Sequence, residues 1–298
     1  MTREEFGQLV AALRDELGWT QLELSESADL DVTTISNIER GTKKQLDQDL
    51  LLRLSKALQM TVGERRQFFQ AASGLDNALL MSRVDGYERP QAIDSAQVLE
   101  ELVRLLSSLR VPCLLVDGYQ EILALNAVTL ELFKTIRDRT LSWSGLPGGF
   151  TTMMSVFTLL SSPEAPVSGN WETSAIANMR LFRERSLPYR AKPYFKYLMR
   201  EFRNTRKYPD FQRYWRLAGT LPEEESSSLQ LYAHLHPALG ELKYYVMPAV
   251  TTTIDGDLYL CQLAPADQNT AEAFRQVAQR AESRAVRFGT WPEKTMHS

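Results

Sequence analysis

The stretch from Gly18 to Gly41 is rich in small and polar residues and has the pattern of a helix, a short turn and a second helix. A helix held in this way can enter the major groove of DNA with its first residues against the base edges. Asn37 carries the two groups that bind adenine at two points, and Val32 and Thr33 can contact a thymine methyl group. The spacing therefore predicts direct contacts to DNA bases.

Phosphate contacts are expected on both sides of these base-reading residues. Gln21 begins the first helix, where its side chain and the free backbone amides can meet a phosphate. Arg40, Lys43 and Lys44 follow the second helix as the only local basic cluster, and a merely solvated role is the alternative for them. The predicted DNA-contacting set is Gln21, Val32, Thr33, Ser36, Asn37, Arg40, Lys43 and Lys44.

A second concentration of charge lies between Arg180 and Arg216, where twelve Lys and Arg residues accompany three acids, giving +9 in 37 residues. Three uses stay open. The stretch could bind a ligand carboxylate by charge-assisted hydrogen bonds, it could make an auxiliary DNA contact, or it could be a solvated helix face paired with acids elsewhere, including residues 223–225. Phe, Met, Trp and Tyr are also frequent between residues 150 and 215, which indicates either plain core or an adaptable apolar pocket.

Catalytic and metal-binding patterns are weak. His234 and His236 fall on one side of a predicted strand, but no acid or Cys nearby completes a metal site, so packing at the strand end is the preferred interpretation. Cys113 and Cys261 lie in separate apolar runs and are expected to be buried, reduced thiols. There is no nucleophile elbow, phosphate-binding glycine loop or His/Glu metal helix. We therefore predict a protein that is not an enzyme and requires no cofactor.

Short helices must position the DNA-contacting residues. Apolar periodicity predicts five of them, at residues 3–17, 21–28, 32–39, 48–58 and 62–72. Three Thr and Glu pairs fit capping boxes at helix starts, namely Thr2 with Glu5, Thr20 with Glu23, and Thr61 with Glu64. Asp31 and Asp47 precede further helices and could cap them. Leu24, Leu30, Ile35 and Ile38 are expected in the core.

The rest of the chain predicts a mixed domain. Residues 75–96 form a connector, 98–109 a helix, and 113–127 two strands joined by a tight turn at Asp117-Gly118. A helix is expected from Ala127 to Lys134, and mostly helical structure over 151–218. Strand-like runs follow at 228–236, 242–254 and 257–264, with a hairpin signal at Asp255-Gly256, and a last helix at 270–287. This order is typical of an α+β domain with an antiparallel sheet.

The net charge of −3 over 298 residues argues against binding nucleic acid through bulk positive charge. Residues 1–74 themselves hold nine basic and twelve acidic side chains. One copy is therefore expected to bind DNA weakly, and a homodimer that reads two half-sites would supply the missing affinity. The chain shows neither a run of about 18 apolar residues nor a secretory signal, so we expect a cytoplasmic protein without a membrane span.

The stretch around the helix pair resembles the helix-turn-helix of phage-repressor-like regulators, the Cro/repressor or XRE family, over about residues 5–72. The matching positions are Thr20-Gln21, Glu23-Leu24, Thr34-Ile35-Ser36, Ile38-Glu39 and Gly41. Two positions depart from the pattern, because Asp29 stands at a turn position that is usually Gly and Ser25 stands where Ala is usual. Asp tolerates the left-handed conformation better than most residues, so the turn is still expected to form.

Residues 100–267 resemble the ligand-binding domain of MmyB-like transcription regulators. The resemblance rests on 116–127 with LALNA at 123–127, Trp171 with Met179-Arg180, YPDFQRYW at 208–215 and HPALGEL at 236–242. Leu125 stands where the family often has Trp, which alters the expected pocket. The resemblance implies a PAS-like fold and an apolar ligand, since a bound long-chain fatty acid is known in the family. The predicted ligand-binding residues are Leu114, Val116, Leu125, Phe133, Met153, Phe157, Met179, Arg180, Phe182, Arg183, Phe202, Trp215 and Tyr245.

We therefore expect an all-α helix-turn-helix domain of five helices and an α+β PAS-like domain with an antiparallel sheet and a helical insertion. The expected boundaries are 1–74 for the DNA-binding domain, 75–96 for a linker, 97–267 for the ligand-binding domain and 268–298 for a C-terminal helix and tail. The expected function is a regulator in which an apolar ligand, such as a fatty acid, modulates the dimer and its operator binding. A ligand-independent DNA-binding protein, whose second domain dimerises or binds a protein, is the alternative. An enzyme fused to a DNA-binding domain would need convergent titratable groups, and none is evident.

Overall fold

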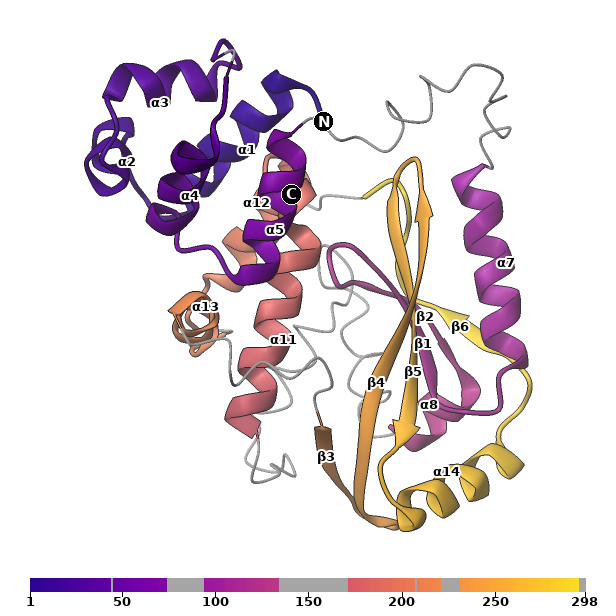
Figure 1. Ribbon diagram of the computed structural model, residues 1–298. Helices are drawn as coiled ribbons and strands as arrows, with labels where there is room; N and C mark the ends of the chain where they lie inside the picture. Colours follow the sequence, from indigo (N-terminus) through magenta and orange to yellow (C-terminus); the bar gives the residue numbers. More distant parts are fainter. Residues whose placement is uncertain (44, 74–93, 134–170, 207, 221–230, 295–298) are drawn as a thin grey trace.

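The computed structural model describes residues 1–43, 45–73, 94–133, 171–206, 208–220 and 231–294 (Figure 1). A helical head at the N-terminus packs beside a larger domain that contains one antiparallel sheet. The head contains α1 (Arg3–Glu16), α2 (Gln21–Ala28), α3 (Val32–Glu39), α4 (Gln48–Ala57) and α5 (Val62–Ala72). The larger domain contains α7 (Ser95–Ser108), β1 (Cys113–Asp117), β2 (Ile122–Asn126), α8 (Ala127–Leu132), α11 (Trp171–Ser186), η1 (Leu187–Tyr189), α12 (Pro193–Phe202), α13 (Phe211–Thr220), β3 (Leu231–His236), β4 (Gly240–Thr253), β5 (Gly256–Pro265), α14 (Gln268–Arg280) and β6 (Ala285–Arg287).

The five helices of the head begin and end within one residue of the predicted positions. All three capping boxes are confirmed, and each Thr hydroxyl accepts a hydrogen bond from the amide three residues on, at 3.1 to 3.2 Å. Asp47 caps α4 by accepting from the Leu50 amide at 2.8 Å. Asp31 occupies the N-cap position of α3, but its side chain makes no cap hydrogen bond there. Local chemistry therefore fixes most helix starts in the head.

The turn between α2 and α3 forms despite the departure from Gly. Asp29 ends α2 in the left-handed conformation, with φ 52° and ψ 51°, and its carbonyl accepts a hydrogen bond from Arg53 at 2.7 Å. Leu24, Ile35 and Ile38 are buried in the head's core, while Leu30 is half-buried against it. The predicted core positions are therefore confirmed, with Leu30 at its edge.

The sheet has the strand order β3-β4-β5-β1-β2-β6, and all its pairs are antiparallel. The predicted tight turn at Asp117-Gly118 is confirmed: the Asp117 carbonyl accepts a hydrogen bond from the Gln120 amide at 3.0 Å, with Gly118 and Tyr119 in the turn. The Asp117 carboxylate draws it closed by accepting from the Tyr119 and Glu121 amides at 2.9 and 3.0 Å. The hairpin between β4 and β5 is confirmed, with Ile254 and Asp255 in its turn, one position earlier than expected.

Helices α7, α8 and α14 pack on the sheet away from the head (Figure 1). Leu106 of α7 is fully buried with Leu115 and Leu258 of the sheet, while Phe274 of α14 packs near Leu263. The predicted helix at 270–287 is wrong in its last turns. Helix α14 ends at Arg280, and residues 285–287 form β6 instead, because the open edge of β2 offers backbone hydrogen bonds to them.

Helices α11, α12 and α13 form a helical layer of the larger domain, in which α11 lies between α13 and the sheet (Figure 1). Their shared core is aromatic, with Phe182, Phe195, Phe202 and Phe211 each at most 1% exposed. The expected helical structure is confirmed over the described part of 151–218, whereas 151–170 lie outside the described residues. Within the described segments, no helix is long and apolar enough to cross a membrane.

Candidate DNA-binding face and ligand domain

The first turn of α3 presents the predicted base-reading side chains to solvent. Val32 is 39% exposed, Thr33 is also exposed, and Ser36 is half-buried one turn later. Helices α2 and α3 lie on the side of the head that faces away from the sheet (Figure 1). A DNA duplex can therefore approach this helix while the head stays on the larger domain.

Asn37 lies on the same helix but is engaged within the protein. Its side-chain oxygen accepts from the Arg40 guanidinium at 3.1 Å and from the Thr42 hydroxyl at 3.3 Å. Its backbone carbonyl accepts from the Lys43 amide at 3.1 Å. A two-point contact to adenine would need the Arg40 bond to be exchanged. Asn37 thus also organises the turn that carries the basic cluster, of which Lys44 lies outside the described residues.

Gln21 is tied to the end of the reading helix. Its amide nitrogen donates to the Glu39 carboxylate at 2.7 Å, and Arg14 of α1 pairs with the other oxygen at 2.7 Å. The Glu39 side chain is only 7% exposed, so this link joins α1, α2 and α3 within the head. Because the Gln21 side chain is engaged with Glu39, the phosphate contact predicted here would have to come from the backbone amides at the start of α2.

The predicted ligand-binding residues fall into two groups. Met179, Phe182 and Phe202 are buried among the helices, with Trp215 half-buried beside them. The second group lies on the sheet: Leu114, Val116 and Leu125 pack with Tyr259 and Cys261, Phe133 lies near Tyr244, and Tyr245 is half-buried on β4. Met153 and Phe157 lie outside the described residues.

The arginines of the basic stretch on α11 point in different directions, one toward α13, one toward the head and one toward the sheet. The Arg180 guanidinium donates to the Ala218 carbonyl at 3.2 Å, and Arg183 points to Glu64 of the head at 2.9 Å. Arg185, which the sequence did not single out, places its guanidinium 3.8 Å from the centre of the Tyr259 ring on the sheet. The helical period of α11 was the only available signal, since residues two apart face roughly opposite sides of a helix.

Asn126 in the LALNA segment holds the edge of the sheet domain together. Its oxygen caps α8 by accepting from the Thr129 amide at 3.0 Å, and its nitrogen donates to the Leu109 and Val111 carbonyls at 3.1 and 2.7 Å. The side chain is 1% exposed. Asn126 therefore fixes the helix α8 and the start of β1, on which Leu114 and Val116 lie.

The remaining candidates, His236 and the two cysteines, make contacts that stabilise the fold or are buried in it. The His236 ring nitrogen Nδ1 accepts from the Ala238 and Leu239 amides at 3.1 Å, which closes the turn between β3 and β4. Cys113 and Cys261 are free, buried thiols, and burial raises the pKa of Cys113 to about 12. At such a pKa the thiol stays protonated at neutral pH, which makes it a poor nucleophile or metal ligand.

The exposed α3 and the α+β domain behind it are the arrangement expected of a DNA-binding regulator with a ligand-binding domain. The family comparisons agree: residues 10–64 match a helix-turn-helix model, and residues 98–277 match the MmyB-like transcription regulator ligand binding domain. The second match covers more than half of the chain, which therefore belongs to the MmyB-like transcription regulators. No curated protein matches the chain.

Proposed function

We propose that this transcription regulator acts as a cytoplasmic homodimer, binds an operator through α3, and changes its operator affinity when its second domain binds a fatty acid or a similar apolar carboxylate. The carrying observation is that α3 stays open while one helix, α11, contacts both the head and the sheet. A ligand that favours one arrangement of this helix layer would shift operator affinity.

The sheet face toward α11 has the chemistry that a fatty acid needs. Val116, Ile122, Tyr259 and Cys261 form a buried apolar cluster on it. Arg185 reaches this cluster from α11 and adds a cation at its aromatic surface. An alkyl chain would pack on the apolar side chains, and an arginine fork suits a carboxylate head group. Of the predicted cations, Arg183 is used in contacts to the head, so Arg185 is the better candidate for the ligand.

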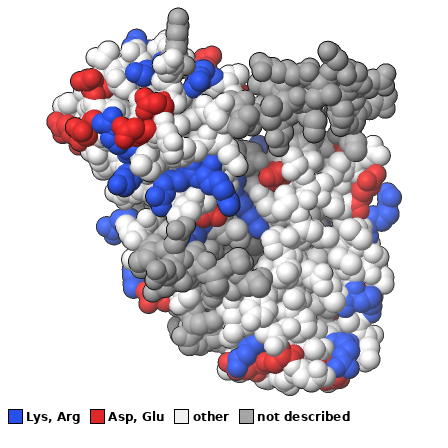
Figure 2. All heavy atoms as spheres, viewed as in Figure 1, with Lys and Arg blue, Asp and Glu red and all other residues white. Residues whose placement is uncertain are grey.

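Dimerisation is proposed from the charge of the head. Acids outnumber bases there by three, and Figure 2 shows acidic and basic side chains interspersed on its visible face. A single head with a net charge of −3 has little of the bulk positive charge that supplies most non-specific DNA affinity. Two heads on two half-sites about one helical turn apart would raise the affinity through effective concentration.

The ligand part of this proposal is tested by mass spectrometry of the purified full chain under native and denaturing conditions. We expect a copurified fatty acid in wild type and its loss in Arg185→Gln. Arg213→Gln is the matched control, because Arg213 belongs to the same basic stretch but forms an exposed pair with Glu172. Retention of the same fatty acid in Arg185→Gln would contradict the role given to Arg185, and absence of any apolar molecule, with no binding of added fatty acid, would contradict ligand sensing.

The alternative function, DNA binding without a ligand, has one observation in its favour. Three apolar residues in the second half of β4 and the turn after it are exposed: Met247 at 45%, Val250 at 54% and Ile254 at 77%. Met247 and Val250 face opposite sides of the sheet, because they pair with Gln262 and Tyr259 of β5. A second domain that serves only dimerisation or a protein partner would use such exposed apolar side chains and would leave operator affinity indifferent to fatty acid.

A further inference from the structure

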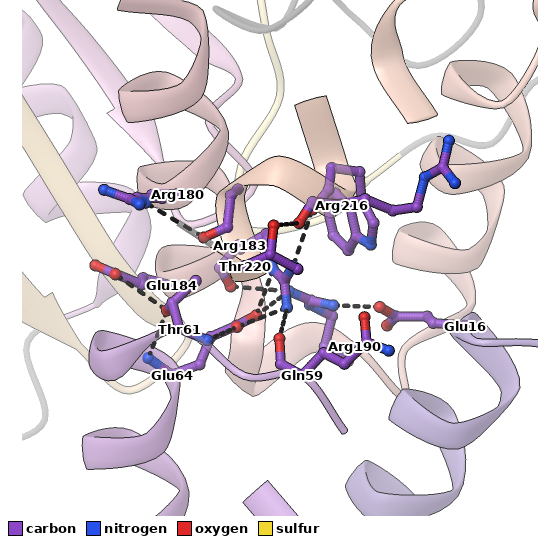
Figure 3. A network of polar contacts seen from close by, with 12 residues as sticks. Glu16, Gln59, Thr61, Glu64, Arg180, Arg183, Glu184, Arg190, Arg216 and Thr220 are labelled. Atoms are coloured by element: carbon purple, nitrogen blue, oxygen red, sulfur yellow. Dashed lines mark hydrogen bonds and ion pairs between the residues drawn. The ribbon is translucent and has the colours of Figure 1, made fainter. Parts of the chain in front are cut away.

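A buried ionic network joins the head to the helix layer of the ligand domain (Figure 3). Glu64, at the start of α5, is 0% exposed and accepts from Arg183 at 2.9 Å and from Arg190 at 2.8 Å. Arg190 also pairs with Glu16 at the end of α1. The two acids come from the head and the two cations from the ligand domain, so the network has formal charge balance across the boundary.

Backbone contacts extend this junction. Arg183 donates to the Gln59 carbonyl of the head at 2.8 Å and to the Trp215 carbonyl of α13 at 2.9 Å. Arg190 donates to the Arg183 carbonyl at 3.0 Å. The side chain of Leu187, from η1, is buried in the core cluster of the head itself. The junction therefore combines paired charges with shared apolar packing, although the buried Glu16 Oε1 and Arg190 Nε atoms have no hydrogen-bond partner among the described residues. Removing one charge would leave its partner buried and uncompensated.

Close packing leaves little room for the head to shift. A methyl group added at Gly219 of α13 would lie 2.6 Å from the Arg183 guanidinium and 2.7 Å from the Gln59 carbonyl. One added at Gly63 of α5 would lie 2.2 Å from the Glu184 carboxyl carbon of α11. Both glycines lie at the junction. At Gly219 the neighbour is a backbone carbonyl, so a larger residue would disturb the packing, whereas at Gly63 only the end of the Glu184 side chain would have to shift.

Helix α11 has a different partner on each side. Arg183 enters the network with the head, whereas Arg185, roughly 200° further round the helix, lies over Tyr259 of the sheet. A displacement of α11 that follows a change at the sheet must therefore also act on the Arg183 to Glu64 contact. The η1 segment makes a second link, because Tyr189 packs on Tyr119 of the β1–β2 turn, with ring centroids 4.6 Å apart, while the next residue, Arg190, binds Glu64.

We propose that Glu16, Glu64, Arg183 and Arg190 form a latch that fixes the DNA-reading head on the ligand domain, and that α11 carries the state of the sheet face to this latch. The latch itself stands on the contacts within the chain. Its role in signalling rests on the proposed function, because it needs a ligand at the Arg185 side.

The latch is tested in the full chain with Glu64→Gln, and Glu23→Gln is the matched control. Both glutamates occupy the third position of a capping box, which Gln can also fill, but Glu23 is exposed and lies far from the junction. Spin labels at Ser27→Cys and Glu272→Cys report the distance between head and ligand domain, since Cys113 and Cys261 are buried. Gly219→Ala gives a second route to the same opening that leaves every charge in place.

We expect a single narrow distance distribution in wild type and in Glu23→Gln, and a broadened or longer one in Glu64→Gln and in Gly219→Ala. An unchanged distance distribution in both junction variants would overturn the latch. If Glu64→Gln fails to fold, an unchanged distribution in Gly219→Ala alone would overturn it. This readout needs no ligand, so it stands even if the proposed function fails.

The signalling role is tested with palmitate as the probe. In wild type we expect palmitate to change operator affinity by about fivefold or more. In Glu64→Gln, palmitate should bind the ligand domain with an affinity within twofold of wild type, while the change in operator affinity falls to less than twofold. A full wild-type response in Glu64→Gln would overturn the signalling role, and so would a wild-type protein that binds palmitate without any response. Failure of palmitate to bind at all would contradict both the proposed function and the signalling role. The distance measurement would still test the latch itself.

Discussion

At the scale of single residues, Asp29 holds a backbone conformation that Gly would adopt more easily. Its φ of 52° lies in the left-handed region, where a side chain costs free energy and Gly costs none. Gly would retain the 2.7 Å hydrogen bond from Arg53 to the backbone carbonyl and would lose only a 3.5 Å pair of Arg53 with the Asp29 carboxylate, which is 98% exposed and therefore contributes little. We predict that Asp29→Gly raises the free energy of unfolding by up to about 1 kcal/mol, measured by urea denaturation. A variant less stable than wild type would contradict this.

A second buried charge cluster joins the C-terminal tail to the turn between β1 and β2. Lys294, with a side chain 6% exposed, pairs with Asp117 and Glu121, and the Tyr194 hydroxyl donates to Glu121. Burial raises the pKa of Glu121 from its ordinary 4.5 to about 7, against the attraction of the Lys294 ammonium. The folded protein therefore holds the Glu121 proton to a higher pH than the unfolded chain does.

The sign of the stability effect follows from this raised pKa. The contribution of protonated Glu121 is fully present below about pH 4.5 and is lost as the pH rises toward 7. We predict that Glu121→Gln flattens the dependence of the unfolding free energy on pH between 4.5 and 7. Urea denaturation at a series of pH values measures it, with Glu100→Gln as an exposed control. Identical slopes in wild type and Glu121→Gln would refute the prediction.

The role of a residue could be predicted from the sequence where its partners are close neighbours along the chain. The three capping boxes and the left-handed Asp29 follow from neighbours within three residues, and the structure confirms them. The partners of Glu64, Arg183 and Lys294 lie more than a hundred residues away along the chain. No periodicity or spacing records such pairs, so Glu64 was expected only as a capping residue and Arg183 as a ligand contact.

At the scale of elements, we propose that α3 reads bases with its first turn and that the turn after it contacts phosphate. Thr33 is exposed, and no hydrogen bond involving its side chain is described within the head, so its removal should not disturb the fold. We predict that Thr33→Ala weakens binding to the preferred operator by roughly 1–3 kcal/mol and relaxes preference at one base pair. Lys43→Ala should instead weaken binding to all DNA sequences alike, and it should reduce the slope of log affinity against log salt concentration by about 1.

Fluorescence anisotropy with operator duplexes that differ at single positions, at several salt concentrations, separates these two effects. Lys56→Ala, on α4 and also exposed, is the control cation away from the reading helix. Equal losses on operator and random DNA for Thr33→Ala would show that α3 does not read bases.

The elements themselves were predictable to different degrees. The head's helices follow from strong apolar periodicity and caps, and the hairpin between β4 and β5 follows from the Asp255-Gly256 pair. Strand β6 was expected as helix because residues 285–287 have no local signal against a helix, and only the open edge of β2 selects the extended form. Sheet edges are tertiary features, so their partners are the part that local patterns miss.

At the scale of the whole molecule, the charges of the two domains are complementary. The head carries a net −3 and residues 180–216 carry +9, and two of the head's acids meet two of these cations in the junction. Lys and Arg side chains also gather beneath the head in Figure 2. Part of the acidity that argued against DNA binding thus serves docking. The third sequence interpretation expected the basic stretch to pair with acids elsewhere, but on a solvated face, whereas Arg183 and Arg190 are buried.

The head alone should therefore be a poor DNA-binding protein. We predict that a monomeric fragment of residues 1–73 binds the operator at least about 100-fold more weakly than the full chain, because it lacks the effective concentration that a dimer supplies. Analytical ultracentrifugation establishes the oligomeric state of each, and anisotropy gives the affinities. Equal affinity of monomeric fragment and full chain would remove the argument for a dimer.

The central claim, that a ligand in the second domain sets operator binding by the first, is tested most directly by one titration. A duplex selected from a random library by the full-length protein is titrated with delipidated protein, with and without saturating palmitate. The account predicts an inverted-repeat duplex whose dissociation constant changes by about fivefold or more when palmitate is bound. The same dissociation constant in both titrations, with palmitate binding confirmed in the same samples, would contradict it.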